Sequence, residues 1–134
     1  MAERVSSLLR RSVAHLAEEV PDSYLLVLDA LGPLVVALDV DGEHFGLRGG
    51  ERIEVCDSAP AAPKAWISAS RDAVLAVLDA AVGLEDAVES GMVEVRGALD
   101  DILRAHDTLL AYVHAAVRAP SQPGLLTALR VGAS

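Results

Sequence analysis

The spacing of the hydrophobic residues changes twice along the chain, and these changes constrain the fold more than any other feature. Between Val5 and Val20, apolar residues recur every three or four positions, which predicts an amphipathic helix, and a second short helix follows as far as about Leu31. Over residues 34–69, apolar residues alternate with polar or small ones, as is typical of β-strands. Helical spacing returns after Ser70. This order of segments predicts an α+β domain.

Turn residues divide the alternating region into four strands. Asp41-Gly42 stands between two alternating runs and predicts a hairpin, because glycine tolerates the positive φ of a tight turn. Gly49-Gly50 marks a second turn, after which Ile53 and Val55 indicate a third strand. A loop rich in proline and alanine, residues 57–63, separates this strand from a fourth over residues 65–69. We predict that the four strands form an antiparallel meander.

The second half of the chain is predicted to contain helices and one short strand. Ser70 is a suitable N-cap for a helix, residues 84–90 predict further helical turns, and Val93 and Val95 indicate a strand. A long helix is predicted from about residue 99 to 118, and its apolar stripe contains Leu99, Leu103, His106, Leu110, Val113 and Val117. Pro120 and Pro123 end this helix. The tail, residues 120–134, has four apolar side chains and is interpreted either as a lid or as a frayed terminus.

Composition excludes several classes of function. The chain has 134 residues, the size of one domain, and 52% of them are hydrophobic, so disorder is not expected. Its formal net charge of −9 opposes binding to nucleic acids and to anionic membranes. The longest apolar run is broken by Asp29 and Gly32-Pro33, which excludes stable membrane insertion. Charged residues near the N-terminus and the lone Cys56 indicate a cytoplasmic protein.

No motif for a metal, a cofactor or a catalytic nucleophile is present. The only histidines predicted on one helix, His106 and His114, are eight residues apart, which does not match a zinc site. No phosphate-binding loop or nucleophile elbow occurs. We therefore expect no metal and no cofactor. His106 lies in an apolar stripe, where it is either hydrogen-bonded locally or acts as a base. If the protein were an enzyme, its acid/base candidates would be His106, Asp39 and His44.

Two segments resemble the sterol carrier protein type 2 family. The first is the helix start at residues 70–75, Ser-Arg-Asp-Ala-Val-Leu. The second is residues 84–97, which read as a helix, a glycine, a short strand and another glycine. Both are similar to that family's pattern. The resemblance covers roughly residues 20–118, between the N-terminal helix (1–20) and the tail, within one domain spanning 1–134. Lys64 and Ala98 depart from the family pattern. The resemblance implies a five-stranded, mainly antiparallel sheet with helices packed on one face around an apolar cavity.

Three hypotheses for function follow, and the first is preferred. The protein binds a lipid, a sterol-like or another apolar small molecule in the cavity, without catalysis. Alternatively, it is a cyclase or isomerase that uses the same cavity. The third hypothesis is an interaction module with a filled core, which forms a homodimer through its first helix. The expected ligand-binding residues are Val36, Leu38, Phe45, Leu47, Ile53, Val55, Val93, Val95, Leu103, His106, Leu110 and Val113.

Overall fold

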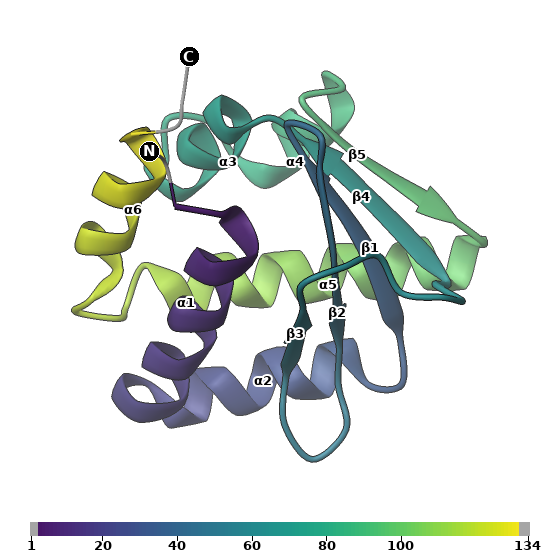
Figure 1. The fold of residues 1–134 in the computed structure, drawn as a ribbon, viewed down its shortest axis with the longest axis horizontal. Helices are drawn as coiled ribbons and strands as arrows, with labels where there is room; N and C mark the ends of the chain where they lie inside the picture. The colour runs from purple at the N-terminus through teal and green to yellow at the C-terminus, as the bar shows by residue number, and fades with distance from the viewer. Residues whose placement is uncertain (1–2, 132–134) are drawn as a thin grey trace.

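The computed structural model describes residues 3–131, which form six helices and five strands (Figure 1). In chain order these elements are α1 (Val5–Glu19), α2 (Pro21–Leu31), β1 (Val35–Val40), β2 (Glu43–Arg48), β3 (Glu54–Cys56), β4 (Ala65–Ala69), α3 (Arg71–Leu78), α4 (Leu84–Glu89), β5 (Val93–Gly97), α5 (Leu99–Ala116) and α6 (Gln122–Val131). The predicted α+β class is confirmed, and part of the predicted tail is α6.

The five strands form one mixed sheet in the order β3-β2-β1-β4-β5. The pairings β1–β2, β2–β3 and β4–β5 are antiparallel, which confirms a mainly antiparallel sheet. The predicted hairpin is also confirmed, since Asp41 and Gly42 have φ values of 52° and 84° and the Gly42 amide donates to Asp39 Oδ1 at 2.9 Å. Two consecutive positive φ values are typical of a type I′ hairpin turn.

The predicted meander is wrong at its fourth strand. β4 does not pair with β3 but runs parallel to β1, on the opposite side of β1 from β2. The connection between β3 and β4 crosses the sheet, and Pro60 packs on Gly46, where an added Cβ would lie 2.8 Å from the proline Cδ. The spacing of the strands in the sequence does not predict this crossover, because the loop between β3 and β4 is long enough for β4 to pair with either β3 or β1.

The two faces of the sheet differ in polarity. Alternate side chains of a strand point to the same face, and one face has the buried Val36, Phe45 and Ile67, over which the helices pack. The opposite face has the exposed Trp66 and Arg48. All the helices therefore lie on one side of the sheet, as the family resemblance implies (Figure 1).

Helix α5 packs through a different face from the predicted one. Leu99, Leu103 and Val117 of the predicted apolar stripe are 71%, 55% and 61% exposed. Alanines are buried instead, and Ala105, Ala115 and Ala116 are fully inaccessible. Small side chains allow close helix packing, and α5 lies against α2, where Arg104 donates to the Ala30 carbonyl at 3.1 Å. Within residues 3–131, no helix is both long and apolar enough to span a membrane.

Candidate functional site

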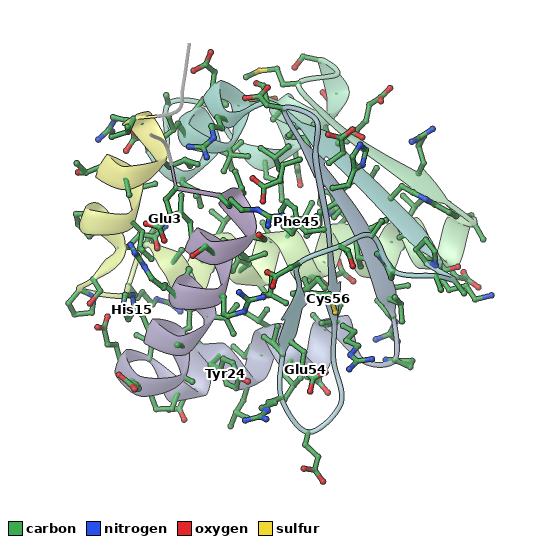
Figure 2. The ribbon with its side chains drawn as sticks, viewed as in Figure 1. Glu3, His15, Tyr24, Phe45, Glu54 and Cys56 are labelled. Atoms are coloured by element: carbon green, nitrogen blue, oxygen red, sulfur yellow. The ribbon has the colours of Figure 1, made fainter. Side chains whose placement is uncertain are left out.

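A cavity of about 180 Å³ lies between the sheet and the helices. On the sheet side its walls come from the apolar face, because every second residue of β1, β2 and β4 points inward. Phe45, which is labelled in Figure 2, lies between the sheet and α1 and is 1% exposed. The sheet residues that line the cavity are Val36, Leu38, Val40, Phe45, Leu47, Ile67, Ala69 and Val93.

The helices form the other walls of the cavity. Helices α1, α3, α5 and α6 each contribute apolar side chains, among them Val5, Leu8, Leu9, Val13, Val74, Val77, Leu78, Leu109, Tyr112, Val113, Leu125, Leu126 and Leu129. None of the described residues that line the cavity carries a charge. Because an isolated charge without a counterion is strongly disfavoured in such surroundings, the cavity is suited to an uncharged, largely apolar molecule.

Seven of the twelve residues expected at the ligand line this cavity, namely Val36, Leu38, Phe45, Leu47, Ile53, Val93 and Val113. The other five lie elsewhere. Val55 faces a groove beside α1, and Val95 packs against the rest of the core. Leu103 is exposed to solvent, and His106 and Leu110 are half-buried outside the cavity lining. The face of α5 that lines the cavity has Ala105, Thr108, Leu109, Tyr112 and Val113, and Leu103, His106 and Leu110 lie outside it.

Sequence reasoning missed the contribution of α1 to the cavity, and it left the tail that contains α6 open between a lid and a frayed terminus. The stripe of Val5, Leu9 and Val13 is visible in the sequence, but its inward direction depends on the packing of α1 over the sheet. The leucines of the tail were the available signal for α6. Leu125, Leu126 and Leu129 are buried and form one cluster with Val5, Leu8 and Phe45.

The three acid/base candidates of the enzyme hypothesis are not assembled at the cavity. Asp39 and His44 are cross-strand partners beside the β1–β2 turn, with Oδ2 and Nε2 4.0 Å apart, and the His44 side chain is exposed. His106 lies on α5 and does not line the cavity. Within residues 3–131, no group of three or more histidine, cysteine or acidic side chains is arranged to hold a metal ion.

A few polar side chains interrupt the apolar lining where α1, α5 and α6 meet. The hydroxyls of Ser12 and Tyr112 are hydrogen-bonded at 2.6 Å, and burial raises the pKa of Tyr112 although the bond to Ser12 lowers it. Thr108 donates its hydroxyl to the Arg104 carbonyl of its own helix at 2.8 Å. Gln122, at the start of α6, is buried and also lines the cavity.

Helix α6 is fastened at both ends to the rest of the protein. At its beginning, Ser121 donates its amide and its hydroxyl to Glu19 of α1, with the amide bond at 3.0 Å. Near its end, the buried Arg71 donates to the Leu129 carbonyl at 3.1 Å and to the Glu3 carbonyl. Arg130 forms an ion pair with Asp79 of the segment after α3. These contacts hold the three leucines of α6 against the cavity.

An open groove runs between α1 and the edge strand β3. Tyr24, Glu54 and Cys56, all labelled in Figure 2, lie along it. Its inner wall includes Val13 and Ile53, which also line the cavity. Two buried side chains therefore separate the cavity from this groove.

Comparison with known proteins identifies the fold. No family model and no curated protein matches the sequence. Among solved structures, a ubiquinone synthesis protein described as UbiJ-SCP2 is similar with a TM-score of 0.62 and 16% identity, over 84% of this chain and 92% of that one. Sterol carrier protein 2 like 2 from Aedes aegypti follows with a TM-score of 0.54 and 17% identity, over 77% of this chain and 94% of that one.

A third similar structure is a possible sterol carrier protein from Thermus thermophilus. It has a TM-score of 0.55 and 13% identity, over 96% of this chain and 88% of that one. The chain thus has the fold of a sterol carrier protein 2 domain, which confirms the resemblance inferred from residues 70–75 and 84–97. At these levels of identity, the comparisons establish the fold and leave the ligand to be argued from the cavity.

Proposed function

We propose that this protein binds an apolar small molecule in the cavity between its sheet and helices, as a carrier or binding protein. The observation that carries the proposal is an uncharged lining, with apolar side chains from both the sheet and the helices, around a volume of about 180 Å³. A closely packed domain leaves few voids larger than a water molecule. A void of this size therefore supports a role in holding a guest.

The size of the cavity limits what it holds in this conformation. An engineered apolar cavity of about 150 Å³ binds benzene, whereas drug-sized ligands occupy about 300–1,000 Å³. The cavity of about 180 Å³ suits one alkyl chain or a small apolar molecule. A larger ligand, such as a sterol, requires a wall to move. We propose α6 as this moving wall, because it contributes three lining leucines and only a few hydrogen bonds and one ion pair would have to break for it to move.

The comparisons suggest which lipids to test first. One similar structure is described as a ubiquinone synthesis protein and others as sterol carriers, so isoprenoid quinones, sterols and simple alkyl lipids form the first panel. We also propose a cytoplasmic carrier, supported by the single unpaired Cys56. The positions of Asp39, His44 and His106 outside the lining do not support a cyclase or isomerase, and the unfilled core does not support a purely structural module.

Native mass spectrometry of the protein as purified tests the proposal directly, because a bound lipid adds its mass to that of the chain. Titration with a neutral fluorescent apolar probe gives an affinity in parallel. We expect dissociation constants below about 100 μM, which corresponds to about −5.5 kcal/mol. The proposal is wrong if no mass is added and if neither the probe nor any lipid of the panel binds in this range.

A further inference from the structure

One wall of the cavity offers unused hydrogen-bond donors. Ser12 of α1, Tyr112 of α5 and Gln122 of α6 all line the cavity, whereas the sheet side of the lining is apolar. The polar atoms of a buried side chain are normally hydrogen-bonded within the protein or to ordered water. A donor or acceptor that has no partner among these three side chains therefore indicates which kind of hydrogen-bonding atom a ligand should supply.

Gln122 has no such partner. It is 7% exposed, and its side-chain amide makes no hydrogen bond with any residue in the described range 3–131. A glutamine amide presents two N–H donors and one carbonyl acceptor. The amide is not among the fully buried unpaired groups of the described residues, so it remains accessible, and its place at the cavity wall allows it to bond to a ligand.

The Ser12–Tyr112 pair has one spare donor. Two hydroxyls carry two hydrogens, and their mutual bond at 2.6 Å uses one of them. No other hydrogen bond of these side chains is present within the described chain. Burial raises the pKa of Tyr112, which keeps its hydroxyl protonated at neutral pH. The pair therefore remains a neutral donor.

We propose that this wall recognises an uncharged oxygen atom of the ligand, a carbonyl or hydroxyl oxygen that accepts hydrogen bonds from Gln122 and from the Ser12–Tyr112 pair. The inference rests on the proposed binding function and names its ligand class, an alkyl or isoprenoid chain that ends in a ketone, quinone, ester or alcohol. A carboxylate is disfavoured, since none of the described lining residues is a cation that would neutralise it.

The test compares ligands of equal chain length. Octan-2-one, octane and octanoate are titrated against the full chain by displacement of the neutral probe N-phenyl-1-naphthylamine. In Gln122→Leu, which keeps the approximate size of the side chain, octan-2-one should bind about two- to tenfold more weakly, the loss expected for one hydrogen bond. Octane should bind equally well or better. The double variant Ser12→Ala/Tyr112→Phe, which removes both hydroxyls and so the spare donor of the pair, should act in the same direction.

Thr108→Val is the matched control. Thr108 also lines the cavity, but it already donates its hydroxyl to Arg104, so its removal should leave the preference for octan-2-one over octane unchanged. The melting temperature of Gln122→Leu should not fall, because no hydrogen bond of the folded protein is lost. A purely structural role for Gln122 would lower it.

Two results overturn the inference while the proposed binding function stands. The first is an equal change in octane and octan-2-one affinity in both Gln122→Leu and Ser12→Ala/Tyr112→Phe. The second is tighter binding of octanoate than of octan-2-one by the wild-type protein. If neither the probe nor any eight-carbon ligand binds, the proposed function itself is wrong, and the inference falls with it.

Discussion

Shortening Leu126 on α6 should change the length of ligand that the protein prefers. Leu126 is buried, lines the cavity and belongs to the cluster with Val5, Leu8 and Phe45. The substitution Leu126→Ala removes three carbons from the wall and extends the cavity by the same amount. A ligand with three more methylenes can then fill the added space.

The magnitude follows from transfer free energies. Three methylenes at about 0.8 kcal/mol each give about 2.4 kcal/mol, or about a 50-fold gain in affinity for the longer ligand relative to the wild-type protein. The unliganded variant should lose about 2–5 kcal/mol of unfolding free energy, the usual range for a buried leucine. The dissociation rate of the shorter ligand should rise, because α6 is held less firmly.

The assay is probe displacement with octan-2-one and undecan-2-one, together with urea unfolding without ligand. Val131→Ala is the control, since Val131 lies on the same helix but is 68% exposed, so both its stability and its length preference should stay near wild type. A variant that loses stability but keeps the wild-type preference for chain length would refute the assignment of α6 as a cavity wall.

Three further predictions concern contacts around this site. Glu43 accepts the Val5 and Ser6 amides at 2.8 and 2.9 Å at the start of α1, so Glu43→Gln should lower the free energy of urea unfolding by about 1 kcal/mol, and an unchanged value would contradict this. Hydrogen bonds from Ser121 hold the pKa of Glu19 below its usual range, so the stability from this contact is present at neutral pH and is lost as the pH falls through the pKa of the folded protein. The melting temperature of Ser121→Ala should therefore fall less steeply with acid than that of the wild-type protein. His106→Ala should leave the affinity for the probe unchanged, because His106 does not line the cavity. A tenfold weaker affinity would show instead that His106 contributes to binding.

The sequence was sufficient to predict most elements because their signals are local. The Asp41-Gly42 turn and the Ser70 cap, whose hydroxyl accepts the Ala73 amide at 3.0 Å, each depend on a few neighbouring residues. Alternation also predicted correctly that Val36, Leu38 and Phe45 share the inner face of the sheet. The 3.6-residue repeat of a helix and the two-residue alternation of a strand are properties of the backbone. They do not depend on what the element packs against.

The errors concern which partner an element packs against. β4 pairs in parallel with β1, and only the path of residues 57–64 across the sheet decides this. On α5, the leucine stripe was the stronger hydrophobic signal, yet the helix buries its alanines. A single-helix pattern does not reveal which face of α5 the rest of the protein covers. Leu103 and His106 were therefore placed at the cavity, the contribution of α1 was missed, and the role of the tail was left open.

Several large apolar side chains lie on the surface of the protein while its interior is not filled. We therefore expect a bound ligand to stabilise the fold. Leu25, Leu26 and Leu99 are largely exposed, while the interior keeps a void of about 180 Å³. The side chains around this unfilled space lack contacts that a closely packed interior would give them, which lowers the stability of the folded protein. A molecule that fills the void restores the lost contacts, and at a concentration 100 times its dissociation constant it adds about 2.7 kcal/mol to the free energy of unfolding. The domain should therefore be least stable when its cavity is empty, which links the retention of ligand to the integrity of the fold.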